Sequence, residues 1–272
     1  MKAVSFNVNS IRMRLHQLEA LIKAEQPDFI GLQETKVNDP DFPVDAIQAL
    51  GYHVEFCGQK THYGVALLSR TPFKTVQKGF VSDTDDAQKR FISGTFELPC
   101  GNDITVMNGY FPQGESRQHA TKFPAKKAFY RDLQTLLDAR YKASDKLIVM
   151  GDMNISHQDI DIGIGEDNRK RWLRTEKCSF LPEEREWLNR LLNWGLIDTY
   201  RQAFPDGCEE AYSWFDYRSK GFDREPKRGL RIDMVLATNS LLRDGFSAGI
   251  CYDIRAMEKP SDHAPIWCQF NA

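Results

Sequence analysis

The most informative stretch of this 272-residue chain reads Lys146-Leu147-Ile148-Val149-Met150-Gly151-Asp152-Met153-Asn154. Its four consecutive apolar residues are typical of a strand that is buried on both faces of a sheet. Gly151 permits a sharp turn after this strand, so Asp152 and Asn154 are expected to project from its end. A Gly-Asp turn after a strand is common, and this segment alone does not define a functional site.

Five other segments place polar groups where a predicted strand ends or is about to begin. They are Ser5-Phe6-Asn7, Gly31-Leu32-Gln33-Glu34-Thr35, Asn108-Gly109-Tyr110, Arg231-Ile232-Asp233 and Ser261-Asp262-His263. With Asp152 and Asn154, these ends carry acids, amides, a phenol and an imidazole. We therefore expect a site built from several strand ends at one edge.

Hydrophobic periodicity predicts how the strands and helices are arranged. Strands are expected over residues 4–8, 28–33, 52–57, 64–69, 74–80, 91–97, 104–108, 147–150, 232–237, 247–254 and 266–270, those between 52 and 108 being consecutive and antiparallel. Helices are expected before Pro27, over 45–50, from Lys122, and from Pro182 to Gly195. This pattern predicts an α/β fold, a four-layer α/β sandwich with two mixed β-sheets packed face to face and helices outside, in one domain over residues 1–272.

Composition and charge bound the functional classes. The net charge of -2 gives no general electrostatic reason to bind nucleic acid, but residues 169–177 hold five bases against one acid and residues 218–231 are also basic. A basic run forms a solvated face about as often as a phosphate-binding surface, so both interpretations stay open. No signal peptide or membrane span is evident, and a cytoplasmic protein is expected. Reduced thiols are expected at the scattered cysteines Cys57, Cys100, Cys178, Cys208, Cys251 and Cys268.

The strand ends are rich in oxygen ligands, namely Glu34, Asp152, Asp233, Asp262, Asn7 and Asn154. Hard divalent cations such as Mg²⁺ and Mn²⁺ prefer these ligands, whereas zinc would favour more His or Cys. Hydrolysis of a phosphate ester suits this set. A positioned base contributes roughly 3 to 5 kcal/mol, whereas such hydrolysis can require about 20 kcal/mol of barrier lowering, so a metal is needed.

Each of these residues also has an ordinary structural explanation. Glu34 could form a strand-end salt bridge, Asn7 and Asp262 could satisfy turns, and Tyr110 could be a half-buried aromatic residue. His263 is harder to explain by packing, because an adjacent carboxylate would favour its cationic form. Motifs for rival chemistries, G-x-x-x-x-G-K-[ST] and H-E-x-x-H, are missing from the sequence, and Gly163-Ile164-Gly165 is interpreted as a flexible loop.

At these segments the chain resembles the exonuclease-endonuclease-phosphatase superfamily, and within it the exonuclease III group of abasic-site endonucleases. The resemblance runs from Met1 to the carboxy terminus. Its ordered motifs are Ser5-Phe6-Asn7, Gly31 to Lys36, Asn108 to Gly114, Gly151-Asp152-Met153-Asn154, Leu230-Arg231-Ile232-Asp233 and Ser261-Asp262-His263-Ala264-Pro265. Lys36, the Tyr110 to Gly114 turn and the Trp172 to Glu186 region narrow it to the exonuclease III group.

The resemblance implies a role for each site residue. Glu34 would be the principal ligand of Mg²⁺, for which Mn²⁺ would substitute, with further ligands expected from Asn7, Asp152, Asn154 and Asp262. Asp152 would orient or deprotonate the attacking water, and Asn154 would hold that water or a phosphoryl oxygen. His263 would contact the phosphate, Asp233 would orient His263, and Tyr110 would assist at the phosphate. A competing assignment makes His263 the base and Asp152 a ligand. Some abasic-site endonucleases have an Asp two residues after the first Asn, whereas this chain has Asn9, so a second metal ligand there is doubtful.

The resemblance also implies cleavage 5′ to abasic sites in double-stranded DNA, 3′-to-5′ exonuclease activity and removal of 3′ blocking groups, by a monomer. Trp214, Leu230 and Ile232 would line a pocket for a flipped base-less sugar, whereas Tyr212 and Phe215 could equally be core residues. Contacts to the DNA backbone are expected from Arg90, Gln113, Lys122, Arg169, Arg171 and Arg174. The alternatives are an inositol or lipid phosphatase using the same centre, and a DNA-binding or scaffold protein that has lost catalysis.

Overall fold

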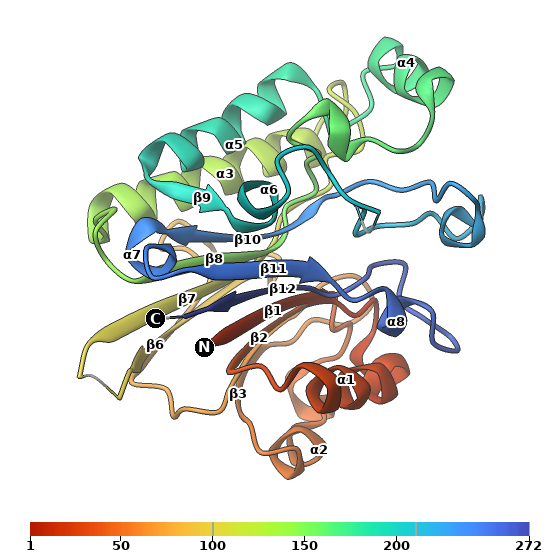
Figure 1. The fold of residues 1–272 in the computed structure, drawn as a ribbon. Coiled ribbons are helices and arrows are strands. Elements are labelled where there is room, and N and C mark those ends of the chain that lie inside the picture. The colour runs from red at the N-terminus through yellow and green to blue at the C-terminus, as the bar shows by residue number, and fades with distance from the viewer. Residues whose placement is uncertain (100, 210, 272) are drawn as a thin grey trace.

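Two six-stranded mixed sheets form the centre of the molecule in the computed structural model, which describes residues 1–99, 101–209 and 211–271 (Figure 1). The first sheet has the order β11-β12-β1-β2-β4-β3 and contains β1 (Lys2–Asn7), β2 (Phe29–Gln33), β3 (His53–Cys57), β4 (Val65–Ser69), β11 (Phe246–Ile250) and β12 (Ile266–Phe270). The second has the order β5-β6-β7-β8-β10-β9 and contains β5 (Thr75–Lys78), β6 (Phe91–Glu97), β7 (Asp103–Tyr110), β8 (Leu147–Asp152), β9 (Leu196–Asp198) and β10 (Asp233–Thr238).

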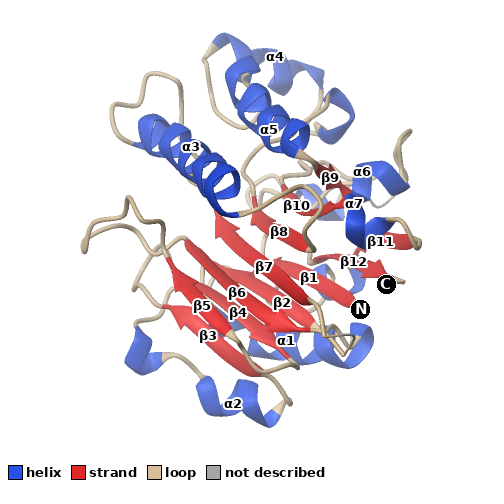
Figure 2. Ribbon diagram, turned by 90° about the vertical axis from the view of Figure 1, so that its left-hand side faces the viewer, coloured by secondary structure: helices blue, strands red, loops and turns tan. Residues whose placement is uncertain are grey.

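Helices cover the outer face of each sheet, as Figures 1 and 2 show. Beside the first sheet lie α1 (Ile11–Glu25), α2 (Val44–Ala49) and α8 (Tyr252–Arg255), and beside the second lie α3 (Lys122–Arg140) and α5 (Pro182–Trp194). The shorter elements are α4 (Glu166–Arg174), α6 (Thr199–Ala203), α7 (Asn239–Leu242) and the 3₁₀ turns Asp39–Asp41, Asp159–Asp161 and Gly221–Asp223. The predicted α/β sandwich is thus confirmed.

Burial on both faces explains the continuous apolar run of β8. Ile148 and Met150 point into the core between the two sheets, whereas Leu147 and Val149 belong to the core beneath α3 and α5. A third core lies between the first sheet and α1 and α2. The strand therefore has no solvent-facing side on which alternation could appear.

The sequence pattern was wrong in places where sheet membership or strand length depends on distant partners. Residues 52–108 are not one antiparallel series, because β3 and β4 join the first sheet and β5, β6 and β7 join the second. The strand expected over 247–254 ends at Ile250, and helix α8 follows. Gly165 precedes α4, which sequence analysis did not predict, and β9, α6 and α7 were also missed.

Strand register brings the polar ends together at one edge. In the first sheet, parallel pairing of β1 with β2 places Asn7 opposite Gln33, one residue before Glu34. In the second sheet, Asp152 pairs with Tyr110 in the parallel partner β7 and with Asp233 in the antiparallel partner β10. Within each sheet, this register brings the polar strand ends to one edge.

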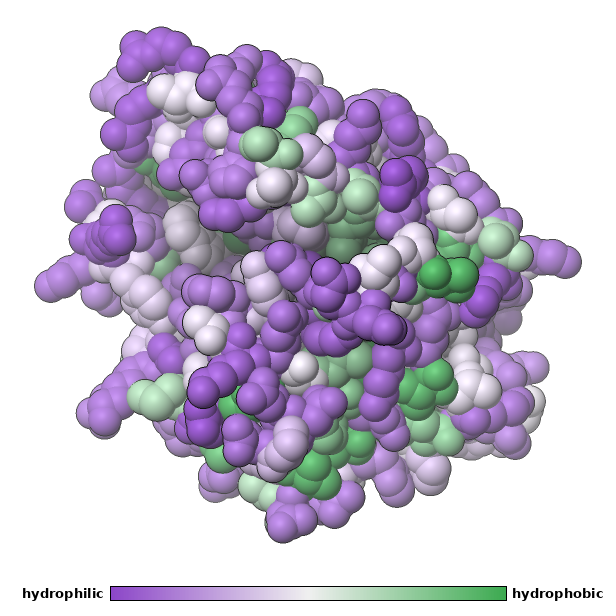
Figure 3. All heavy atoms as spheres, turned by 180° about the vertical axis from the view of Figure 1, so that it is seen from behind, coloured by the Kyte–Doolittle hydropathy of each residue, from purple (hydrophilic) through white to green (hydrophobic). Residues whose placement is uncertain are grey.

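The surface and the thiols complete the description of the fold. The face in Figure 3 is predominantly hydrophilic, with apolar side chains in small separate groups. Among the described residues, no helix is both long and apolar enough to cross a bilayer. The described cysteines are free thiols, and Cys100 lies outside the described residues.

A buried ion-pair network anchors the segment that enters β10. Arg231 is 1% exposed, and its guanidinium donates to Asp161 Oδ1 at 2.7 Å and to Asp198 Oδ2 at 2.7 Å. Arg201 also donates to Asp161, and the Arg231 backbone N–H donates to the Asp161 carbonyl at 2.9 Å. The network fixes the chain two residues before Asp233 and so positions the site.

Replacing Asp161 with Asn should lower the free energy of unfolding at pH 7 by about 3 to 5 kcal/mol, because two buried guanidinium groups lose a charged partner. Burial would raise the pKa of Asp161, but Arg231, the Gln158 backbone hydrogen bond and Arg201 together outweigh burial and hold that pKa below its usual value. The stabilisation is therefore present above the unfolded pKa of about 3.9 and is lost as the pH falls through the lower folded pKa. Urea unfolding of both proteins across this pH range measures the difference.

Asp159→Asn serves as the control, because Asp159 pairs with Arg169 and Arg185 while its side chain is 62% exposed. Exposed pairs contribute at most about 1 kcal/mol. Equal losses in the two variants, or a loss for Asp161→Asn that persists unchanged in acid, would contradict the assigned role of the network.

Candidate active site

The side-chain amide of Asn7 joins the two sheets at the edge where the strand ends meet. Its Nδ2 donates to Glu34 Oε1 at 2.9 Å and to Asp152 Oδ2 at 3.0 Å. Its Oδ1 accepts a hydrogen bond from the Asn9 backbone N–H at 3.0 Å. Asn7 therefore presents donor hydrogens to both carboxylates, and its oxygen faces the turn after β1. Its expected role as a metal ligand stays a prediction.

Glu34, Asp152 and His263 form a group that could hold a metal ion, since one ligand atom from each lies within 4.8 Å of the others. Burial raises the pKa of Asp152 to about 7, and Asp233 and Glu34 add to this effect while His263 opposes it. The site therefore concentrates negative charge that a divalent cation would relieve. Two carboxylates at this spacing fit a hard cation such as Mg²⁺ or Mn²⁺.

His263 is held between two acids. Its Nδ1 donates to Asp233 Oδ2 at 2.9 Å, and its Nε2 lies 3.8 Å from Asp152 Oδ2. Burial alone would lower the pKa of His263, but Asp233 and Asp152 outweigh burial and raise it to about 10. The imidazole is thus fixed in orientation, with Nε2 directed toward the acidic group as a donor, and in this protonated form it leaves Glu34 and Asp152 as the candidate metal ligands of the group.

Asn154 occupies a strained turn directly after β8. Its φ of 52° lies in the left-handed region, which asparagine tolerates better than most residues. Its backbone N–H donates to Asp152 Oδ1 at 3.0 Å, and its Nδ2 donates to the Phe111 carbonyl at 2.9 Å. These bonds fix the side chain and leave Oδ1 as its acceptor for a water or other polar group.

Tyr110 ends β7 beside Glu34. Burial raises the pKa of its hydroxyl well above the usual value, and the nearby Glu34 raises it further, so the phenol stays protonated as a donor. Arg90 packs over the Tyr110 ring at 4.5 Å and over the Tyr63 ring at 4.4 Å, and its Nη1 donates to the Tyr110 carbonyl at 3.0 Å. Arg90 therefore supports the phenol, in addition to any contact that it makes with a ligand.

A chain of polar contacts links Glu34 to Trp214. Lys36 Nζ lies 2.8 Å from Glu34 Oε2 and donates to Asn9 Oδ1 at 2.6 Å. Asn9 Nδ2 donates to Asp262 Oδ1 at 2.8 Å, and Trp214 Nε1 donates to Asp262 Oδ2 at 3.1 Å. The structure thus shows Asp262 holding an amide and an indole, while its expected part in metal binding stays a prediction.

A cavity of about 150 Å³ lies directly over these groups. Trp214, Leu230 and Ile232 line it, as the sequence analysis expected of a small apolar pocket. Phe215 is fully buried in the central core, and Tyr212 packs against that core, so the structural explanation holds for this pair. Sequence analysis missed Trp172 and Ser179 as lining residues; only the position of Trp172 within the basic run could have indicated it.

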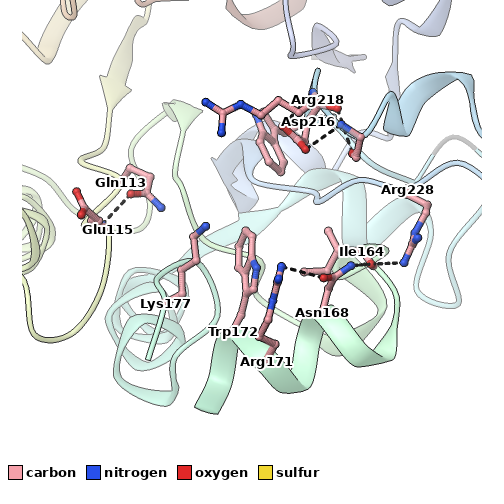
Figure 4. Close-up of a pocket in the computed structure, with 12 residues that line it drawn as sticks. Gln113, Glu115, Ile164, Asn168, Arg171, Trp172, Lys177, Asp216, Arg218 and Arg228 are labelled. Carbon is pink, nitrogen blue, oxygen red and sulfur yellow. Dashed lines mark hydrogen bonds between the residues drawn. The ribbon is translucent and has the colours of Figure 1, made fainter. Parts of the chain in front are cut away.

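Basic side chains border two wider hollows beside this cavity. One, of about 450 Å³, is lined by Arg90, Gln113 and Lys122, although Lys122 Nζ also pairs with Glu115 at 2.5 Å. The other, of about 660 Å³, lies between α4 and the 214–228 loop (Figure 4), and its basic lining residues are Arg171, Lys177, Arg218 and Arg228.

The structure separates the three arginines that α4 was expected to offer to DNA. Arg171 lines the hollow in Figure 4 and donates to Asn168 Oδ1 at 2.9 Å. Arg169 pairs with Asp159 at 2.8 Å and with Glu166 at 3.4 Å, whereas Arg174 is exposed near the end of the helix. Arg218 and Arg228 on the facing loop were not among the expected contacts, although the sequence analysis noted their basic segment.

Comparison with known proteins is consistent across sequence and structure. The model of the Endonuclease/Exonuclease/phosphatase family matches residues 4–263. The chain is 57% identical to exodeoxyribonuclease III of Haemophilus influenzae, covering 99% of this chain and 100% of that protein. It is 30% identical to the DNA repair nuclease APEX1 of Danio rerio, covering 98% of this chain and 81% of that one.

Solved structures agree over the full length of the chain. The 3′ phosphatase NExo from Neisseria, in a structure bound to a product DNA hairpin, superposes with a TM-score of 0.88 at 34% identity. An AP endonuclease from Archaeoglobus fulgidus gives a TM-score of 0.88 at 32% identity. Each covers 100% of both chains. The chain therefore belongs to the endonuclease/exonuclease/phosphatase family, and within it to the exonuclease III group of DNA repair nucleases, which are hydrolases of phosphoester bonds.

Proposed function

We propose that this protein is a Mg²⁺-dependent DNA repair hydrolase, active also with Mn²⁺, that cleaves the phosphodiester bond 5′ to an abasic site, degrades duplex DNA from 3′ ends and removes 3′ blocking groups. The observation that carries this proposal is the cluster of Glu34, Asp152 and His263 beneath a small apolar cavity. The names of the AP endonuclease and 3′ phosphatase relatives support the same activities. A cytoplasmic monomer with one domain over residues 1–272 is part of the proposal.

Glu34 is proposed as the principal metal ligand, with Asp152 beside it. The ion would supply Lewis-acid stabilisation of the charge that develops on the phosphoryl and leaving oxygens. Asp152 is suited to orient or deprotonate the attacking water, because burial raises its pKa to about 7 and brings its basicity close to neutral pH. Asn154 would hold that water or a phosphoryl oxygen with its fixed side chain.

His263 and Tyr110 are proposed as hydrogen-bond donors to the phosphate. The Asp233 contact and the raised pKa of His263 favour a protonated imidazole, which donates from Nε2 and cannot accept a proton. This observation favours Asp152 over His263 as the base. Tyr110, protonated beside Glu34, would donate to the phosphate or to the leaving oxygen.

The apolar cavity suits a flipped sugar that carries no base. Trp214, Leu230 and Ile232 offer apolar surface next to the acids, and a volume of about 150 Å³ favours a small group over a paired nucleotide. Flipping costs least where pairing is already lost, which would select abasic sites. Each proposed reaction sends water to a phosphorus beside a 3′-oxygen, so one centre can serve all of them.

The purified protein should nick a duplex that contains a single abasic analogue in the presence of Mg²⁺, and excess EDTA should abolish the nicking. Removing the ion would leave the acids without the cation that balances them at the phosphate. Gel analysis of the labelled strand measures the product, and adding back Mg²⁺ or Mn²⁺ is the control. Undiminished cleavage in EDTA would exclude the metal role. Faster hydrolysis of inositol phosphates than of the abasic duplex would show that DNA is not the preferred substrate.

Asp152→Asn should retain binding to the abasic duplex but lose turnover by at least about a hundredfold, because the change keeps the shape of the side chain and removes its basicity. Single-turnover cleavage and a binding titration without cleavage measure the two effects. Asp145→Asn, in the exposed turn before β8, is the matched control and should behave as wild type. A near-normal single-turnover rate for Asp152→Asn would exclude Asp152 both as base and as ligand.

Arg171→Ala and Arg174→Ala should each reduce the salt dependence of DNA binding, lowering the slope of log K against log salt by about 0.9 per lost phosphate contact. Binding to an uncleavable duplex over a range of salt concentrations measures the slope. Unchanged slopes would assign this part of α4 to the solvated surface. For Arg169→Ala, an unchanged slope would mean that Arg169 serves its ion pairs with Asp159 and Glu166 and does not contact a DNA phosphate.

A further inference from the structure

A lysine and a glutamate pair out of contact with solvent beneath the active-site turns. Lys126 in α3 and Glu184 in α5 both have side chains that are 0% exposed, and Lys126 Nζ lies 2.5 Å from Glu184 Oε1. The same two helices contribute Phe129, Tyr130 and Trp187 to the core that they form with the second sheet. Neither Lys126 nor Glu184 is among the residues assigned to the proposed reaction.

Each hydrogen of the Lys126 ammonium has a defined acceptor. Besides Glu184, Nζ donates to the backbone carbonyl of Asn154 at 2.8 Å and to that of Gln113 at 3.3 Å. An ammonium group has three donors, so its capacity is filled. The carbonyl of Asn154 belongs to the residue whose left-handed turn places an amide in the active site. Lys126 therefore holds the turns that follow β7 and β8.

Glu184 extends the same network to a third segment. Its Oε2 accepts the backbone N–H groups of Ser179 at 2.9 Å and of Leu181 at 2.8 Å, before α5 begins. Gln113, Asn154 and Ser179 all line the cavity over the catalytic acids. A single buried ion pair thus connects three separate segments of the cavity wall from below.

Stability alone does not account for a charged pair at this position. Desolvation of two buried ions offsets most of their attraction, and apolar residues of similar volume are often at least as stable in such places. What an apolar pair could not provide is a donor to the Asn154 and Gln113 carbonyls together with an acceptor for two N–H groups. The charges of Lys126 and Glu184 are therefore explained by the backbone groups that they hold in place.

We propose that the Lys126–Glu184 pair is a positioning device for the active site, which sets the placement of Asn154 and Gln113 relative to the catalytic acids. Tyr130 adds to this support from the same helix, since its hydroxyl donates to the Met153 carbonyl at 2.8 Å. This inference rests on the proposed nuclease function, because it assigns to the pair an effect on the rate of that reaction.

The test is the double variant Lys126→Met/Glu184→Gln, which removes both charges, retains nearly the same volume and leaves an amide oxygen to accept the Ser179 and Leu181 N–H groups. We expect a folded protein whose kcat on the abasic duplex falls about 10- to 100-fold, while KM changes less than about threefold, since small displacements of supporting groups cost rate in this range. Lys127→Met, the next and exposed residue of α3, is the matched control and should retain both constants.

The outcomes separate the two proposals. A double variant that is folded by circular dichroism and thermal unfolding, with unchanged kcat, would overturn the positioning role and leave the nuclease function intact. A wild-type protein that does not cleave the abasic duplex would instead overturn the proposed function. If the double variant does not fold, Glu184→Asp decides, because it keeps both buried charges and only shortens the acidic side chain by one methylene group. A fall in kcat of about threefold or more at constant KM supports the proposal, and no fall refutes it.

Discussion

One amide joins the two sheets of this protein at the place where the chemistry is concentrated. Asn7 donates from a single nitrogen to Glu34, the residue after β2 of the first sheet, and to Asp152 of the second sheet. Two carboxylates repel each other when they are brought close in a buried place, and a shared donor between them reduces that repulsion. Two further groups of the site are linked to this contact through Asp152. Asp152 lies opposite Asp233 in the sheet, and Asp233 in turn holds His263.

The excess of negative charge explains why the cationic groups lie where they do. Lys36 contacts Glu34, and His263 lies between Asp233 and Asp152 with a pKa raised to about 10. These two cations offset only part of the charge of the acids Glu34, Asp152, Asp233 and Asp262. Burial, with Asp233 and Glu34 adding to it, raises the pKa of Asp152 to about 7. These acids would repel a phosphate group unless it approached together with a divalent cation.

The sequence predicted the parts of this arrangement that depend on local pattern. The apolar run of β8 placed Asp152 and Asn154 at a strand end, and the same reasoning applied to Asn7 and Glu34. The sharp turn expected at Gly151 was wrong, because β8 continues through Gly151 to Asp152 and the chain turns only after that residue. Nothing local showed that β4 and β5 lie in different sheets, because side-chain alternation is the same whichever sheet a strand joins. The partners of Arg231 and Lys126 were equally hidden, since the anions lie 33 and 70 residues away from Arg231 and 58 residues away from Lys126 in the chain.

Backbone strain collects at the same edge. Asn9, Glu34, Lys36 and Asn154 all have positive φ, between 42° and 57°, and none is glycine. Each such residue costs on the order of 1 kcal/mol or more, and it persists only where surrounding contacts determine its conformation. Here those contacts are the polar chain through Lys36 and Asn9 and the buried ammonium of Lys126 on the Asn154 carbonyl. The strain and the buried charges are therefore two parts of one arrangement, in which stability is given up to hold polar side chains at fixed positions around the cavity over Glu34 and Asp152.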